Sequence, residues 1–271
     1  HGGKTTFSSD ESWVILSEIE QRIKAKIEAI GTPLKEWDIS INYGIKTGFN
    51  DAFIINGEKR AELIAQDPKS AEIIRPILRG RDIKRYGYDF ADLYLINTHN
   101  GVKEKGIKRI HIEDYPAVKA HLDLYYPQLE KRADQGDTPY NLRNCAYIED
   151  FFKQKVAWAS VGETYYSLIP EGTFLLDTNY FFSTEDSWFL GFLNSKLITY
   201  WINSEDTPIG NGGAYRHYKY NLEKLPIIEI DDLIKTSIIE LVKSKEYNKI
   251  DQLLYKLYNL SEEEIKFIEN I

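Results

Sequence analysis

The segment YGIKTGFNDAFII, residues 43–55, combines a polar turn with an apolar end that is typical of a strand. Gly44 and Gly48 flank Lys46 and Thr47, and glycine leaves the backbone free to turn closely around a ligand or another chain segment. The residues that follow, 52–55, are apolar and rich in aromatic and β-branched types, which predicts a strand. A turn of this kind that leads into a short strand favours a mixed fold over a helical bundle.

The same pattern continues on both sides of this segment, from Trp37 to Pro226. Short strand-like runs alternate with glycine and proline turns, and three helical stretches interrupt them. The sequence therefore predicts an α/β (α+β) domain with a mixed sheet. The predicted strands are Ala52–Ile55, Leu93–Asn97, Lys155–Ala159 and Thr173–Leu176, and the predicted helices are Glu58–Gln66, Pro116–Arg132 and Trp188–Asn203.

Both ends of the chain predict helices. A capping box at Ser8–Glu11 precedes isoleucines at four-residue spacing, and Gly31 ends the run, which predicts a connector helix within residues 1–36. A polar, glycine-rich loop is expected at 204–220. Residues 229–271 predict a helical tail of three helices, 232–245, 248–258 and 261–270, so residues 37–228 remain as the central domain. The chain holds no Met and begins at His1, so we expect it to be an excised fragment of a longer protein.

Composition and charge set limits on the class of protein. The net charge of −8 argues against indiscriminate coating of nucleic acid, which depends on many phosphate contacts. Residues 75–111 nevertheless carry nine basic and four acidic side chains; a solvated face is the alternative explanation. The apolar run Trp188–Ile202 is too short and too interrupted for a membrane span. The single Cys145 excludes an internal disulfide, and we expect a cytoplasmic protein.

Searches for a catalytic centre return only weak candidates. Residues 206–212 fit the loose glycine pattern of an S-adenosylmethionine loop, but the expected strand before it and helix after it are missing. The one Glu-x-Lys, at 264–266, falls in a predicted surface helix, where it does not form a metal nuclease site. The histidines show no zinc-binding spacing. We therefore expect no catalytic, cofactor or metal site within this chain.

Several blocks share the order found in one family of DNA-modifying enzymes. Besides residues 43–55, they are RPILRGRDIKRY (75–86), KRADQG with PYNLR (131–136 and 139–143), KVAW (155–158), LNSK (193–196), LPI (225–227) and LYKLYNLSEEEI (254–265). Together they resemble the TaqI-like C-terminal specificity domain, the target recognition domain of type IIG restriction-modification enzymes and related DNA adenine methyltransferases. The resemblance covers about residues 34–270.

This resemblance implies a module that recognises a short sequence in double-stranded DNA and itself catalyses nothing. Upstream domains of the same polypeptide would carry adenine methylation and cleavage, with S-adenosylmethionine and Mg²⁺ as their cofactors. The Asn-Pro-Pro-Tyr motif of the adenine methyltransferases is absent here. No membrane partner is expected.

Twelve residues are the candidate DNA contacts. Amide, hydroxyl and ammonium donors suit phosphate, Arg can read guanine in bidentate fashion, and interleaved aromatic and basic groups suit an unstacked base. The alternatives are an ordinary turn at 44–50, an Arg81–Asp82 ion pair, and buried Arg–carboxylate pairs at 132 and 143. The candidates are Lys46, Thr47, Asn50, Arg79, Arg81, Lys84, Arg132, Arg143, Tyr215, Arg216, His217 and Lys219.

Two other functions remain open at this stage. The chain could use the loop at 206–212 to bind S-adenosylmethionine as a methyltransferase fragment. It could also be an interaction module whose terminal helices dock a separate methyltransferase subunit, as specificity subunits do in type I systems. Isolated DNA affinity would then be negligible.

Overall fold

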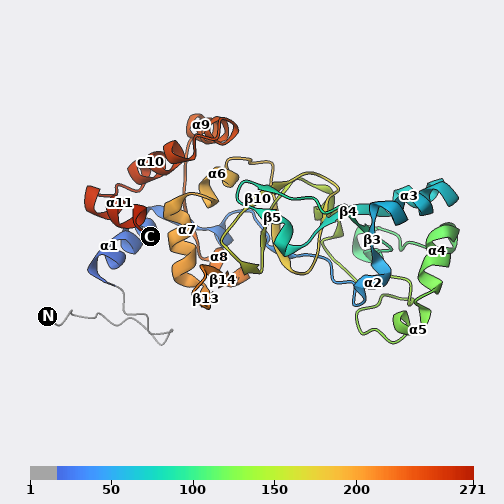
Figure 1. The fold of residues 1–271 in the computed structure, drawn as a ribbon. Helices are drawn as coiled ribbons and strands as arrows, with labels where there is room; N and C mark the ends of the chain where they lie inside the picture. Colours follow the sequence, from blue (N-terminus) through green and yellow to red (C-terminus); the bar gives the residue numbers. More distant parts are fainter. Residues whose placement is uncertain (1–16) are drawn as a thin grey trace.

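Two hydrophobic cores lie side by side along an elongated chain (Figure 1) in a computed structural model that describes residues 17–271. A four-stranded antiparallel sheet, in the order β10-β8-β12-β2, separates the two cores. Neighbouring residues of β8 face opposite cores: Ala157 faces the first, while Val156 and Trp158 face the second. This is the alternation that a strand buried on both faces requires. The strands are β10 (Ser167–Ile169), β8 (Lys155–Ala159), β12 (Asn179–Ser183) and β2 (Asn42–Tyr43).

The first core is built on a second sheet, in the order β11-β4-β7-β3, with one parallel pair, β11 and β4. Short helices cover this sheet at the end of the molecule away from the chain termini (Figure 1). The sheet strands are β3 (Ile54–Asn56), β4 (Ile74–Leu78), β7 (Leu93–Ile96) and β11 (Phe174–Leu175). The helices are α2 (Asn50–Phe53), α3 (Gly57–Gln66), α4 (Pro116–Asp123), α5 (Tyr126–Leu129) and the 3-10 helices η2 (Pro68–Glu72), η4 (Lys103–Lys105), η5 (Ile112–Asp114) and η6 (Ile148–Phe152).

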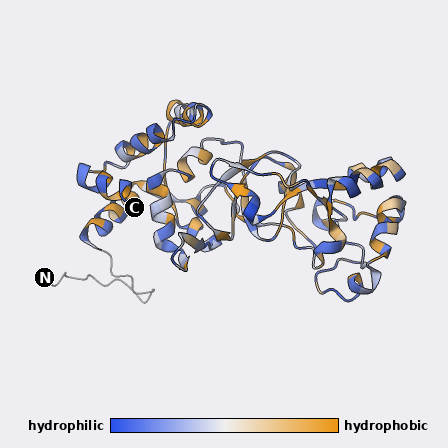
Figure 2. Cartoon of the chain, viewed as in Figure 1, coloured by the Kyte–Doolittle hydropathy of each residue, from blue (hydrophilic) through white to orange (hydrophobic). Residues whose placement is uncertain are grey.

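The second core contains both ends of the described chain. Apolar residues of its helices pack in this core. Figure 2 shows hydrophobic and hydrophilic residues alternating along these helices. Strands β1 and β15 pair next to this core. Its elements are α1 (Glu18–Ile30), β1 (Gly31–Pro33), η1 (Leu34–Glu36), α6 (Phe189–Leu193), α7 (Lys196–Glu205), α8 (Lys219–Glu223), β15 (Pro226–Ile228), α9 (Asp232–Lys243), α10 (Tyr247–Leu257) and α11 (Glu262–Glu269).

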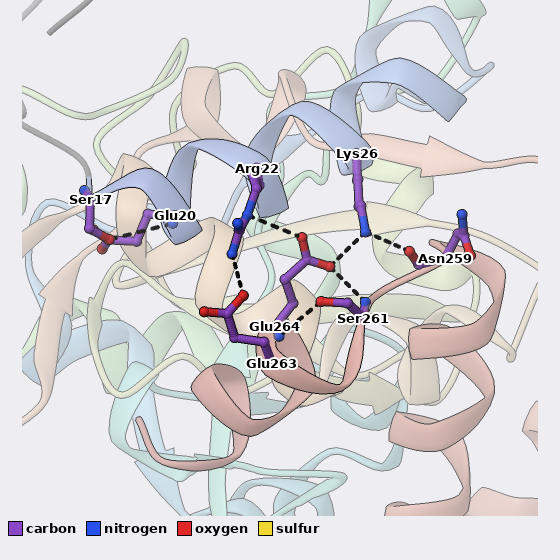
Figure 3. A network of polar contacts seen from close by, with 8 residues as sticks. All are labelled: Ser17, Glu20, Arg22, Lys26, Asn259, Ser261, Glu263 and Glu264. Carbon is purple, nitrogen blue, oxygen red and sulfur yellow. Dashed lines mark hydrogen bonds and ion pairs between the residues drawn. The ribbon is translucent and has the colours of Figure 1, made fainter. Parts of the chain in front are cut away.

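A network of charges joins the first and last helices (Figure 3). Lys26 Nζ lies 2.6 Å from the Glu264 carboxylate, which is almost fully buried, and Arg22 lies 2.7 Å from Glu263. Ser261 and Glu264 also form the predicted capping box of α11. The C-terminal tail thus packs against α1. The domain boundaries at residues 36 and 228 stay a prediction.

Three small elements complete the fold and carry candidate contacts. They are the 3-10 turn η3 (Gly80–Asp82), the hairpin β5 (Ile83–Lys84) with β6 (Gly87–Tyr88), and the sheet β13-β14-β9, formed by β13 (Thr207–Ile209), β14 (Ala214–Arg216) and β9 (Val161–Gly162). The mixed α/β class and the three-helix tail are confirmed.

Several predicted elements differ in detail. The predicted helix 116–132 divides into α4 and α5 because Pro127 lacks the N–H that would continue it. The predicted helix 188–203 divides where Ser195 caps a new helix. Residues 50–53 are a helical turn and the strand begins only at Ile54. Helix α1 begins at Glu18 with a capping box on Ser17 and ends before Gly31, while the predicted box at Ser8 lies outside the described residues.

Candidate nucleic-acid interface

Asp134 joins two of the predicted contacts that are distant in sequence. Its carboxylate lies 3.1 Å from Lys46 Nζ and 3.1 Å from Arg143 Nη1. Burial alone would raise the pKa of Asp134, but hydrogen bonds from Lys46 and Arg143 outweigh it and lower the pKa. Both cations are about half exposed. Each can therefore turn from Asp134 toward a phosphate at modest cost, because exposed ion pairs are weak.

Arg132 and Thr47 hold the backbone around Lys46 and Asp134, and both of their side chains are nearly inaccessible. Arg132 is 7% exposed and donates hydrogen bonds to the backbone carbonyls of Thr47, Asp134, Pro139 and Asn141. Burial lowers its pKa to about 10. Thr47 is 1% exposed and donates to Asn50 Oδ1. The predicted direct DNA contacts at these two buried residues stay a prediction, and the hydrogen bonds show both side chains holding the neighbouring backbone. The expected carboxylate partner of Arg132 is replaced by carbonyls.

The two candidate arginines of the 75–86 block, Arg79 and Arg81, differ in their contacts. Asp82 accepts from the backbone N–H of Arg79 at 2.8 Å and from its guanidinium Nε and Nη2 at 3.0 and 2.8 Å. The hydrogen bond from Asp82 raises the pKa of Arg79. Arg81 is exposed, and within residues 17–271 its side chain has no partner. The alternative Arg81–Asp82 ion pair is therefore wrong: the 3-10 turn brings residues 79 and 82 together.

Hydrogen bonds connect this block to the hairpin formed by β13 and β14. Gly80 N donates to Thr178 Oγ1 at 2.9 Å, and Ser160 N donates to Thr178 O at 2.8 Å. The His217 N–H in turn donates to Ser160 O at 3.0 Å. Arg81 and Arg216, 135 positions apart in sequence, are thereby connected through a few residues.

Strand β9 contacts the elements that carry the two exposed arginines. The 3-10 turn η3 packs against it, and Arg216 pairs in register with Val161 and Tyr215 with Gly162. Arg216 is exposed, and among the described residues it has no side-chain partner. Lys84, close to Arg81 in sequence, is exposed and donates to the Arg81 carbonyl at 2.9 Å.

His217 and Lys219 are less available than their neighbours in the hairpin. His217 is 3% exposed, and its Nδ1 lies 2.6 Å from Asp206 Oδ2. Asp206 is equally buried and also accepts from Asn221 Nδ2 at 2.8 Å. Lys219 pairs with Glu223 at 3.4 Å. The predicted DNA contact at His217 stays a prediction, and the observed contact with Asp206 holds this side chain at the base of the β13–β14 hairpin.

Two hollows are lined in part by candidate contact residues. One, of about 240 Å³, is lined by residues that include Asn50, Arg79 and Leu176. The other, of about 320 Å³, includes Lys46, Arg143 and Asp177. We define the candidate DNA surface as the exposed or partly exposed members of the predicted set, without Arg79 and Lys219, which pair with Asp82 and Glu223 close by in sequence. Its residues are Lys46, Asn50, Arg81, Lys84, Arg143, Tyr215 and Arg216.

The acidic and polar residues that hold these segments in place could not be predicted from the sequence. Asp134, Asp206 and Thr178 each bind a partner at least nine residues away in sequence. Asp134 stands inside the KRADQG block, so the block itself was the available signal. Asp206 begins the glycine pattern at 206–212, which suggests a cofactor loop and not a partner for His217, and Thr178 stands in no local pattern.

Residues 207–216 form a β-hairpin instead of the strand-loop-helix unit that an S-adenosylmethionine loop requires. In residues 17–271, no three His, Cys, Asp or Glu side chains gather where they could hold a metal ion. Every helix in the same range is too short or too polar to span a bilayer.

Comparison with solved structures reveals the same fold in two restriction-modification enzymes. The type IIL restriction-modification enzyme MmeI, solved in complex with DNA, matches 89% of this chain with a TM-score of 0.63 at 13% identity. The type IIG restriction endonuclease BpuSI matches 83% with a TM-score of 0.55 at 15% identity. The chain spans 37% and 27% of the lengths of those two chains. No family model and no curated protein matches the sequence.

Proposed function

We propose that this chain is the specificity domain of a type II, IIG-like restriction-modification enzyme and recognises a short sequence in double-stranded DNA. Its fold is that of a part of two type II restriction-modification enzymes, and one of them was solved bound to DNA. A fold alone does not assign a function, so the proposal also depends on the site.

The observation that carries the proposal is that Arg81 and Arg216 stand on two elements, η3 and β14, that both contact β9. Both guanidiniums are exposed and uncommitted within the described chain. An uncommitted guanidinium can donate two hydrogen bonds to guanine O6 and N7 in the major groove. Two of them on adjacent elements suit contacts to neighbouring base pairs.

The other exposed residues fit contacts to the DNA backbone. Lys46, Lys84 and Arg143 offer positive charge on the same connected segments, and phosphate contacts fix register without reading sequence. Tyr215 is partly exposed beside Arg216 and offers an aromatic face. Thr47, Arg132 and His217 act indirectly in this proposal by holding the contacting residues in position.

The proposal assigns catalysis to other parts of the parent polypeptide. Upstream domains would methylate adenine and cleave DNA, using S-adenosylmethionine and Mg²⁺, and this chain would select the site. We further propose a cytoplasmic location, where the half-buried Cys145 would stay reduced.

Selection of a random duplex library by the purified chain at low salt tests this function. We expect enrichment of one short motif, and weaker binding of a scrambled duplex at two salt concentrations. An Arg81→Ala/Arg216→Ala variant should lose the enrichment, whereas Lys266→Ala on the exposed face of α11 should keep it. Absence of any enrichment would contradict the proposal and favour the interaction module that docks a separate methyltransferase subunit.

A further inference from the structure

A cleft beside the candidate DNA surface has the dimensions and the lining of a small-molecule site. Its volume is about 320 Å³, and it is lined by residues 43–46 and 142–147 and by Asp177. Small-molecule sites begin at about 300 Å³. The volume of the cleft therefore lies at the lower end of that range, which suits a ligand of about one nucleotide.

Two tyrosines supply aromatic surface to this cleft. Tyr43 is 49% exposed on the edge strand β2, and its ring packs on Tyr180 with centroids 4.9 Å apart. Tyr147 is partly buried, and its ring contacts Phe151 and Phe181. Because neighbouring rings hold both tyrosines, they offer stacking surface with little loss of side-chain freedom.

Asp177 and the two cations supply the polar groups. The Asp177 backbone N–H is bonded to Ile45 O at 3.0 Å, while no side chain in residues 17–271 donates a hydrogen bond to its carboxylate. An ionised carboxylate accepts hydrogen bonds and donates none, so it favours a partner that carries N–H groups. Lys46 and Arg143 also line the cleft, and each can turn from Asp134 toward an anion.

We propose that this cleft binds the base of an unstacked deoxynucleotide that carries an exocyclic amine: adenine, cytosine or guanine. The base stacks on Tyr43, its amine donates to Asp177, and its phosphate meets Lys46 and Arg143. Thymine presents a carbonyl oxygen where the amine would be, and this oxygen would face the carboxylate. The inference deepens the proposed function, since the base would come from the bound DNA.

Titration of the 271-residue chain with mononucleotides tests the cleft without any duplex. We expect dAMP and dCMP to shift the backbone amide resonances of residues 43–46 and 142–147, and dTMP to bind about tenfold more weakly, as the loss of one charge-assisted hydrogen bond predicts. Inorganic phosphate should shift only resonances near Lys46 and Arg143. Equal binding of dTMP and dAMP, or shifts elsewhere or none, would overturn the inference.

Variants and a second DNA probe separate the two proposals. Asp177→Asn should abolish the preference over dTMP and Tyr43→Ala should weaken all three mononucleotides, whereas Asp186→Asn, an exposed acid outside the cleft, should change nothing. A duplex with one unpaired adenine should bind about tenfold more tightly than one with an unpaired thymine. If mononucleotides bind as expected but neither duplex does, the cleft accepts free nucleotides and the proposed function fails. If duplexes bind with no preference, only the cleft is refuted.

Discussion

The Asp82 carboxylate holds Arg79 by three hydrogen bonds, one from its backbone N–H and two from its guanidinium. Asp82 is almost fully buried, so this pair closes the 3-10 turn from inside. Arg81 is thereby left to point away from the pair. Two arginines that the sequence makes equivalent candidates for base reading are thus separated into a structural and an accessible one.

Substitution of the two arginines should have opposite consequences. Arg79→Ala leaves the buried Asp82 carboxylate without its charged partner and should lower the free energy of unfolding by about 2–3 kcal/mol. Arg81→Ala removes a side chain that has no partner in the described residues, so it should change the free energy of unfolding by no more than about 0.5 kcal/mol. It should instead relax the selected DNA sequence at one position, costing about 1–3 kcal/mol of discrimination. Denaturation and library selection measure the two effects, and an unchanged motif for Arg81→Ala would refute base reading there.

Removal of a phosphate-contacting charge should act on all DNA sequences alike. Lys46→Ala is expected to weaken specific and scrambled duplexes by the same factor and to flatten the salt dependence by about one unit. Asp134 then keeps only Arg143, so the variant should also raise the pKa of Asp134 toward its ordinary value. Binding isotherms across salt concentrations and carboxyl NMR titration test both statements. A sequence-selective loss would instead make Lys46 a base contact.

A buried lysine in the central sheet predicts an unusual pH dependence. Lys155 is fully buried, its Nζ lies 3.2 Å from the carbonyl oxygens of Pro170 and Thr173, and burial lowers its pKa to about 8. The unfolded chain keeps this proton up to about pH 10. Between pH 8 and 10 the unfolded state therefore binds more protons, and stability rises with pH by about 1 kcal/mol per unit from this group.

Comparison with Lys155→Met isolates this contribution. The variant keeps an unbranched apolar chain, and the titrations of Cys145 and the tyrosines are common to both proteins and cancel in the difference. The stability of the natural protein relative to the variant should increase from pH 8 to 10 in urea denaturation. Parallel pH curves would show that Lys155 is not titrating in this range.

Local signals in the sequence predict those helices whose ends are marked by a capping box or a terminating glycine. The box at Ser261–Glu264 and the stop at Gly31 bound helices as expected. The split of the helix at 188–203 arises because Asn194 is buried and bonds the backbone of Tyr166, 28 residues away. Such a long-range demand on the backbone leaves no local pattern.

The candidate site shows the same division. The basic residues could be nominated from the blocks in which they stand, but their partners come from distant loops. Asp134, for example, meets Lys46 across 88 positions. Those distant partners decide which of the candidate side chains are held in the fold and which are exposed. The sequence alone therefore could not distinguish the held residues, Arg79, Arg132 and His217, from the exposed Arg81 and Arg216.

The buried pair of His217 and Asp206 offers a test of whether the hairpin acts as one unit. His217→Ala leaves a carboxylate with 3% exposure without its nearest partner and should cost about 3 kcal/mol of stability. The double variant with Asp206→Ala should lose less than the sum of the single losses, because both single variants break the same contact. Since the His217 backbone N–H also joins β14 to Ser160, hydrogen exchange of amides 214–217 should accelerate in His217→Ala. Additive losses with unchanged exchange would show that the pair does not hold Arg216 against β9, and the indirect role of His217 in DNA recognition would then fail.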